Sequence, residues 1–352
     1  MSRFIQLHLL TNYPPSNLNR DDTGRPKVAL MGGVNRLRIS SQSQKRAWRA
    51  SDVFQTALGG HLGTRTKEQG RLIFEALKQG GIEDKAAREW AKSIAEQFGK
   101  LKSDKKTENN EDLQIEQLAN FSPDELQAIQ QLLAACIARK SAPTTDELKL
   151  LRKADSAVDI AMFGRMLADS PEFNMEAAVQ VSHAITVHQS AVEDDYFTAI
   201  DDLNSNGAAH IGERGYGAGL FYTYLCINRE QLINNLSGNT DLTNKALAAL
   251  LDAVTKVAPT GMQNSFASRA YASFVLAEKG NQQPRTLAQA FLKPIAAFEQ
   301  DQHSMLEKAV DALNRRKDNF DAVYGACADE RKFLDVEAGQ GSLAELIRFV
   351  QD

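Results

Sequence analysis

Four short segments with the apolar pattern of β-strands are spread unevenly along this 352-residue chain. Residues 3–10 alternate between apolar and polar side chains, as a half-buried strand does. The other three segments, residues 178–189, 220–227 and 270–277, all lie in the second half. A helical pattern fills most of the region between the first two segments, and another, residues 243–257, separates the last two. This order is typical of the split βαβ arrangement and predicts an α+β protein with an antiparallel sheet and two main helices.

The same arrangement predicts two domains. It requires residues 60–168 to be a helical insertion, so that residues 1–59 and 169–352 together form the other domain. Within the insertion, residues 99–112 contain only one strong hydrophobe, and we expect a mobile loop there. The hydrophobic content of 43% is enough for a substantial core.

The run from Arg38 to Arg49, R-I-S-S-Q-S-Q-K-R-A-W-R, predicts a strand or loop that continues into a helix. Ser41 and Gln44 have the spacing of a capping box, which would place the start of that helix. Lys45 and Arg49 lie one turn apart on one face. Together with the unpaired N–H groups of a helix N-terminus, these cations favour binding of backbone phosphates. The same residues also fit an ordinary capped surface helix with a solvated basic side.

Basic residues are concentrated near the amino end. Residues 1–58 contain nine Lys and Arg against three Asp and Glu, a net of +6. Because the whole chain carries −4, the remaining 294 residues carry −10. The overall charge excludes a general affinity for nucleic acid, whereas a basic segment on an acidic body predicts one localised site for a polyanion.

Residues 194–219 combine strand-forming residues with a glycine-rich second half, which is typical of a projecting hairpin. Tyr196, Phe197 and Ile200 are its bulky side chains, and acidic residues flank them. These side chains either fold onto the core or form an apolar wedge on an arm that the acidic residues keep in water. The glycines near Gly217 are expected to let another chain or a nucleic acid approach the backbone closely.

Several classes of protein are disfavoured. The glycine clusters form neither a P-loop nor a dinucleotide-binding fingerprint. Cys136, Cys226 and Cys327 are too far apart for a disulfide framework or a zinc site, which fits a reducing cytoplasm. No apolar stretch is long enough to span a membrane, and the first residues lack the pattern of a signal peptide. We therefore expect a cytoplasmic protein with no metal site and no cofactor.

The histidines leave one catalytic alternative open. His8 lies with Gln6 on the polar side of the first predicted strand and could face His183 across the sheet. Such a pair could support acid–base cleavage of RNA. Both imidazoles also fit the description of partly buried structural histidines. No set of nucleophile, base and orienting group is evident, so no catalytic residue is predicted.

Several motifs together resemble one known family. They are L-N-R-D-D (18–22), R-I-S-S-Q-S (38–43), G-R-M (164–166), S-H-A-I-T-V-H-Q (182–189) and D-Y-F-T-A-I-D-D-L (195–203). Their order and spacing are similar to those of the CasC family, the backbone subunit of the type I-E CRISPR Cascade complex.

The resemblance implies an RRM-like (ferredoxin-like) palm, fingers formed by the helical insertion, and a thumb formed by a hairpin at about residues 193–217. It also implies a non-catalytic subunit whose copies stack along crRNA, with each thumb reaching over the neighbouring palm to displace a guide base. The remaining bases would pair with target DNA in antiviral defence. The implied partners are crRNA, target DNA through the guide, neighbouring copies and other Cascade subunits, without a membrane.

The residues that the resemblance assigns to RNA binding fall into three groups. They are guide-backbone contacts at Arg20, Lys27, Ser40, Gln42, Lys45 and Arg49, further contacts at the finger–palm junction by Arg165 and Met166, and the wedge of the thumb at Phe197 and Thr198. Sequence-neutral binding of RNA needs such a set, because cations follow phosphates while apolar or aromatic surfaces hold bases. The alternative function is an RNA endonuclease that processes guide precursors through His8 and His183.

Overall fold

The computed structural model describes residues 2–352 except 103–107, 154, 201, 204–207 and 297–302. The chain divides into two compact units. The sheet unit consists of Met1–Ala57, Val179–Glu230 and Asn244–Asp352, and the helical unit consists of Leu58–Ala178 and Gln231–Thr243. The helical unit therefore contains all of the predicted insertion and, in addition, residues 58–59, 169–178 and 231–243.

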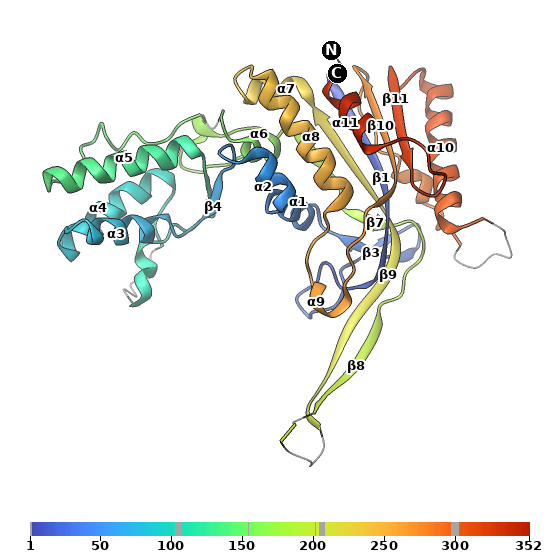
Figure 1. Ribbon diagram of the computed structural model, residues 1–352, viewed down its shortest axis with the longest axis horizontal. Helices are drawn as coiled ribbons and strands as arrows, with labels where there is room; N and C mark the ends of the chain where they lie inside the picture. Colours follow the sequence, from blue (N-terminus) through green and yellow to red (C-terminus); the bar gives the residue numbers. More distant parts are fainter. Residues whose placement is uncertain (1, 103–107, 154, 201, 204–207, 297–302) are drawn as a thin grey trace. The chain divides into compact units, whose positions relative to one another are not determined.

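The sheet unit is a mixed α+β structure built on one large antiparallel sheet (Figure 1). Its strands are β1 (Phe4–Ser16), β2 (Val28–Met31), β3 (Val34–Ile39), β6 (Val179–Val181), β7 (Ala184–Thr186), β8 (Glu193–Ile200), β9 (Ala208–Asn228), β10 (Ala272–Gly280) and β11 (Glu330–Asp335). Their order is β11-β10-β1-β9-β7-β3-β2, and β6 and β8 also pair with β9. The predicted antiparallel sheet is thus confirmed, with β1 between β9 and β10.

The central position of β1 explains why it is buried on both faces. Gln6 and His8 are 3% and 0% exposed, so β1 is not the half-buried strand that its alternation predicts. Its polar side is covered as well. Leu10 on that face packs with residues of the 3₁₀ helix η4 (Ala288–Phe291) and of α10 (Met305–Tyr324).

Several strands differ from the predicted segments. Residues 178–189 form two short strands, β6 and β7, because Ser182 and His183 interrupt the pairing with β9. The predicted strand 220–227 is only the end of β9, which is 21 residues long. The first part of β9 continues past the end of β1 and pairs with β8. Strand β3 ends in the segment predicted as a strand or loop before the basic helix. Strands β2 and β11 have no counterpart among the predicted segments; they form the two edges of the sheet and are largely exposed.

Helices pack against both faces of the sheet (Figure 1). Besides η4 and α10, they are α1 (Ser41–Arg49), α2 (Asp52–Leu58), α8 (Thr240–Lys256), α9 (Gln263–Phe266) and α11 (Leu343–Gln351), while α7 (Arg229–Asn235) begins in the sheet unit and ends in the helical unit. The predicted helix 243–257 is confirmed by α8. Its buried residues Ala246, Leu247 and Leu250 recur at helical spacing and form one side of the helix. Nearer the C-terminus, η4 and α10 are separate elements.

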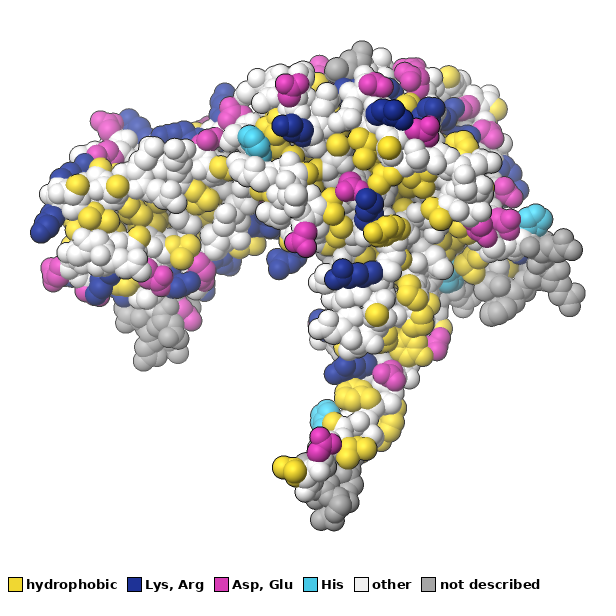
Figure 2. Space-filling view, in the orientation of Figure 1, with side chains coloured by type: hydrophobic (Ala, Val, Ile, Leu, Met, Phe, Trp, Pro, Cys, Tyr) yellow, Lys and Arg dark blue, Asp and Glu magenta, His cyan; other side chains and the backbone are white. Residues whose placement is uncertain are grey.

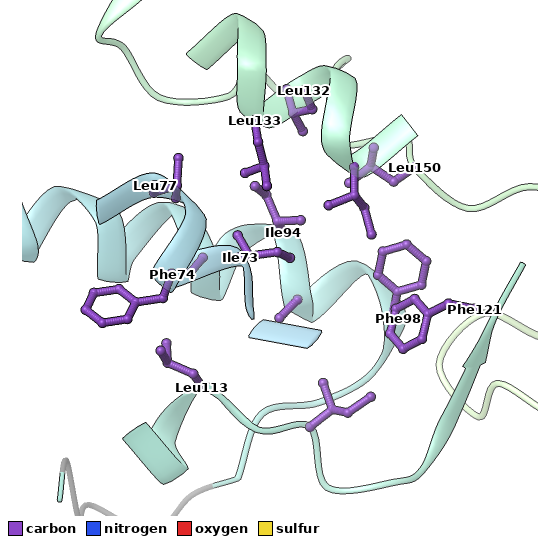
Figure 3. Packing of buried hydrophobic residues seen from close by; sticks show 14 of the residues in the cluster. Ile73, Phe74, Leu77, Ile94, Phe98, Leu113, Phe121, Leu132, Leu133 and Leu150 are labelled. Carbon is purple, nitrogen blue, oxygen red and sulfur yellow. The ribbon is translucent and has the colours of Figure 1, made fainter. Parts of the chain in front are cut away.

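The helical unit packs its helices around their own hydrophobic core (Figure 3). Its elements are β4 (Thr64–Thr66), α3 (Gln69–Gln79), α4 (Asp84–Ala95), η1 (Glu96–Phe98), η2 (Glu108–Leu113), β5 (Ala119–Phe121), α5 (Pro123–Arg139), α6 (Val158–Phe163) and η3 (Pro171–Phe173). Ile73 and Leu77 of α3 meet Ile94 of α4 and Leu133 of α5 in this core.

The predicted mobile loop at residues 99–112 falls partly on residues 103–107, which lie outside the described part of the chain. Its last residue is well anchored. Asp112 is 7% exposed and forms ion pairs with Arg88 at 2.7 Å and Lys92 at 2.8 Å. The end of this segment is therefore part of the packed helical unit.

Candidate nucleic-acid interface

The first turn of α1 is held by the two N-terminal motifs. Ser40 is the N-cap, and its hydroxyl accepts a hydrogen bond from the backbone N–H of Ser43 at 3.3 Å. The backbone N–H of Ser40 donates to the side chain of Asn19 at 2.8 Å. Gln44 is buried and donates to a carbonyl oxygen between β6 and β7 at 3.1 Å. The predicted capping box of Ser41 and Gln44 is therefore wrong. Ser40 is buried, and its hydroxyl caps the helix instead of facing solvent.

Four of the five cations predicted to contact RNA lie on α1 and in the loop before β2. Arg20 and Gln42 are exposed, and Lys27, Lys45 and Arg49 are half-buried. Burial lowers the pKa of Lys45. Partial burial disfavours the charged form of this amine, and a phosphate bound beside it would favour that form. A bound anion would therefore offset the cost of burying the amine.

Two residues outside the predicted contacts join this surface. Arg38 comes from β3, and His183 lies between β6 and β7. The Nη1 atom of Arg38 and the Nδ1 atom of His183 are 3.1 Å apart. His183 is exposed as a whole, but partial desolvation of its ring, and then the charges of Arg38 and Lys27, lower its pKa. Local spacing gave no signal for this pair, because the two residues are 145 positions apart.

The loop of residues 19–27 is attached to the base of a hairpin formed by β8 and residues 208–216 of β9, which we call the arm. Arg25 donates two hydrogen bonds to the carboxylate of Asp194, at 2.7 and 3.4 Å. Asn17 is buried, and its Nδ2 donates at 2.8 Å to the carbonyl oxygen of Gly215 in the arm and at 2.9 Å to a carbonyl oxygen in the loop. These contacts couple the direction of the arm to the position of the loop.

The glycines at the base of the arm make room for segments of this chain. A Cβ on Gly215 would lie 3.1 Å from the ring of Pro26, and a Cβ on Gly217 would lie 2.8 Å from the side chain of Leu37. Alternate residues of a strand face the same side, so both glycines lie under the loop and β3. The expectation that Gly217 admits another chain or a nucleic acid is therefore wrong.

The arm exposes large apolar side chains (Figure 2). Tyr196 is 61% exposed, Ile200 77% and Ile211 57%. Tyr196 and Ile200 therefore do not fold onto the core, and the expectation that they do is wrong. Thr198 is also exposed and lies opposite Ile211 in the register of β8 and β9.

Phe197 lies on the other face of the arm from Thr198, since successive residues of a strand alternate. Its ring covers Gly212, where a Cβ would lie 2.6 Å from the ring. The guanidinium of Arg214 lies 4.4 Å from the centre of the same ring, and His210 stands beside it. This face combines an aromatic ring with a cation, whereas the face of Thr198 is mainly apolar.

The finger residues Arg165 and Met166 have different environments. Met166 is 75% exposed, so it can contact a ligand. Arg165 is 6% exposed, forms an ion pair with Glu125 at 2.8 Å, and donates at 2.9 and 3.0 Å to the carbonyl oxygens of Arg152 and Phe173. Its donors and charge are used inside the helical unit. We therefore correct its predicted role: Arg165 supports the segment that carries Met166 and does not present its guanidinium to RNA.

The histidines of the catalytic alternative do not form a pair. His8 is 0% exposed, and its Nδ1 and Nε2 atoms are hydrogen-bonded to Tyr222 and Glu278 at 2.8 and 3.2 Å. Burial lowers the pKa of His8, so the imidazole is neutral at pH 7. His183 contacts Arg38 instead. The proposed acid–base pair of an endonuclease is therefore not assembled.

The fold and this surface match a known class of protein. The model of the family described as CT1975-like protein matches residues 5–347, so the chain belongs to that family. The predicted membership of the CasC family is thereby confirmed.

No helix in the described part of the chain is long and apolar enough to cross a membrane.

Solved structures are similar over the whole chain. One, described as "CRISPR RNA-guided surveillance complex, pre-nicking", is 29% identical with a TM-score of 0.81, and the match covers 99% of each chain. Another, described as "CRISPR RNA-guided surveillance complex", is 24% identical with a TM-score of 0.74 over 99% of each chain and shows the shared fold. A search of curated protein sequences finds no match.

Proposed function

We propose that this protein is a non-catalytic backbone subunit of a type I-E CRISPR surveillance complex (Cascade) that binds crRNA along its phosphate backbone. In this proposal the sheet unit is an RRM-like palm, the helical unit forms the fingers, and the arm is the thumb. Copies of the chain oligomerise along the guide, contact other Cascade subunits, and present guide bases for pairing with target DNA. The observation that carries the proposal is the cationic surface around α1 in a member of this family.

The chemistry of this surface fits a guide of any sequence. The sugar–phosphate backbone repeats identically, so cations that bind phosphates leave the choice of target to base pairing. With Arg165 corrected, the predicted cations are Arg20, Lys27, Lys45 and Arg49. At about −0.7 per phosphate on a single strand, four such contacts give a slope of log affinity against log salt of about −2.8 per subunit.

Replacing Lys45 and Arg49 together by alanine is expected to weaken RNA binding and to flatten this salt dependence by about 0.7 to 1.4 units, because one or two phosphate contacts are lost. Filter binding of a guide-length single-stranded RNA at several salt concentrations measures the slope. The double variant Lys308→Ala with Arg315→Ala on α10 removes the same charge and should leave the slope unchanged. A slope for the α1 variant equal to that of the unmodified protein would contradict the proposal.

Replacing Phe197 by alanine is expected to weaken the hold on the displaced base by about 1–3 kcal/mol, because its ring beside Arg214 offers a base an aromatic surface and a cation together. A fluorescent adenine analogue placed at successive guide positions reports where bases are unstacked in the assembled complex. The periodic signal should fade in the variant. Phe333→Ala, which removes a partly exposed ring on β11, is the matched control. An unchanged periodic signal in Phe197→Ala would assign the wedge to another residue.

A further inference from the structure

We propose that Lys27, Arg38 and His183 form a phosphate-binding site of the sheet unit in which His183 takes up a proton when a phosphodiester binds. The inference rests on the proposed function, because the phosphodiester would belong to the guide RNA. Lys27 lies before β2, Arg38 in β3 and His183 between β6 and β7. The site thus joins three separate segments beside the first turn of α1.

The geometry of the site sets the hydrogen-bonding state of His183. Arg38 has only donors, so its contact of 3.1 Å makes Nδ1 of His183 the acceptor. A neutral imidazole that accepts at Nδ1 carries its proton on Nε2 and presents one donor there. The guanidinium of Arg38 keeps further N–H groups, and the backbone N–H of Arg38 donates to the carbonyl oxygen of Lys27 at 2.8 Å, which keeps these two residues adjacent.

The charges around this site are unbalanced. Both charged groups that act on the imidazole of His183 are cations, Arg38 and Lys27. Among the described residues, no carboxylate forms an ion pair with either cation, whereas the nearby Arg25 is paired with Asp194 at 2.7 Å. A cluster of positive charge without a carboxylate is stabilised by a bound anion. Phosphate fits best, because three donors from separate segments can reach different oxygens of one group.

Binding is therefore linked to protonation. In the free protein, partial desolvation of the ring and then the two cations hold the pKa of His183 below its ordinary value of 6.5. A phosphate next to the ring reverses the sign of the local field and raises that pKa. Binding then takes up a proton on Nδ1 of His183, which ends the hydrogen bond from Arg38 and frees that guanidinium N–H to donate to the phosphate. The affinity increases as the pH falls from about 8 to 6, by at most about tenfold per pH unit for one proton.

The test compares the pH dependence of RNA affinity in three full-length proteins at constant salt. The unmodified protein should bind a short oligouridylate more tightly at pH 6 than at pH 8. His183→Gln should lose most of that dependence, and His61→Gln, which removes an exposed imidazole of the helical unit, should retain it. A His183→Gln protein with the full pH dependence, or an unmodified protein with none, would overturn the inference. Circular dichroism at each pH verifies that the proteins are folded.

A second measurement needs no RNA. The proton NMR signal of the His183 ring, assigned by comparison with His183→Gln, is titrated with pH in the absence and presence of inorganic phosphate. The apparent pKa should rise with phosphate, and Arg38→Gln should reduce that rise. No change with phosphate would refute the site even if the protein binds RNA. Conversely, failure of the unmodified protein to bind RNA at any pH and salt, with the phosphate effect intact, would reject the proposed function and leave only an anion site.

Discussion

Replacement of Glu278 by alanine is expected to lower the free energy of unfolding of the sheet unit by about 3–5 kcal/mol. The Glu278 carboxylate is 0% exposed and forms ion pairs with Arg285 at 2.6 Å and Arg331 at 2.7 Å. It also accepts a hydrogen bond from His8. Without this carboxylate, largely buried Arg285 and the buried His8 imidazole lose their acceptor, while Arg331 keeps its pair with Asp321 at 2.8 Å. The uncompensated burial of Arg285 and His8 is the main source of the loss.

Urea unfolding followed by tryptophan fluorescence measures this change. The chain has two tryptophans, of which Trp48 lies in the sheet unit and Trp90 in the helical unit. A Trp90→Phe background therefore reports the sheet unit alone. Glu230→Gln is the matched control, since its side chain is 65% exposed and its pair with Arg3, which is itself 54% exposed, is 3.5 Å long. The control should change the free energy of unfolding by less than about 0.5 kcal/mol. An equally small loss in Glu278→Ala would show that the network formed by Glu278, Arg285, Arg331 and His8 does not stabilise the sheet unit.

The same network predicts that acid destabilises the sheet unit. Burial lowers the pKa of His8 below its ordinary value of 6.5, so unfolding takes up a proton once the pH falls below that value. Burial alone would raise the pKa of Glu278, but hydrogen bonds from His8 and Arg285 outweigh burial and hold it well below its usual 4.5. Its contribution is present above about pH 4.5 and is lost as the pH falls through the lowered value. Both groups act in the same direction, and Glu278→Gln should remove the lower step.

Replacement of Glu125 by alanine is expected to destabilise the helical unit by a similar amount, about 3–5 kcal/mol. Its carboxylate completes the capping box of α5 by accepting from the backbone N–H of Ser122 at 2.9 Å. It also accepts from the backbone N–H of Arg152 at 2.9 Å and pairs with buried Arg165 at 2.8 Å. The variant thus removes one end of the cap and leaves a buried guanidinium unpaired. Hydrogen exchange of peptides from α5, measured by mass spectrometry, should show faster exchange.

Two further variants separate the cap from the ion pair. Ser122→Ala removes only the cap hydroxyl and should cost about 1 kcal/mol. Glu125→Leu combined with Arg165→Met replaces both charges by apolar side chains and should recover much of the stability lost in Glu125→Ala. Under conditions where the double variant is folded, its salt slope for RNA should equal that of the unmodified protein, because Arg165 faces the interior. A reduced slope would restore Arg165 as a contact.

Local patterns predicted the elements of the sheet unit well where neighbours in sequence decide the structure. The apolar spacing of residues 243–257 corresponds to α8, and the glycine-rich segment after Ile200 belongs to a hairpin. The cap of α1 was misplaced by one residue because Ser40 and Ser41 have the same side chain, and only the packing of Gln44 against β6 and β7 distinguishes them. Strands β2 and β11 were missed because exposed edge strands lack a clear apolar side.

What the sequence by itself determined was the family, the order of the main strands, the presence of a basic helix and the position of the arm, because motifs, alternation and turn residues act over a few neighbouring positions. Only the tertiary structure decided which charges remain available to a ligand. Arg165 is neutralised by Glu125, 40 positions away, whereas Arg38 meets His183, 145 positions away, without an acidic partner among the described residues. Burial and pairing of charges depend on such distant segments, and for that reason only the folded chain separates a structural arginine from one that can bind phosphate.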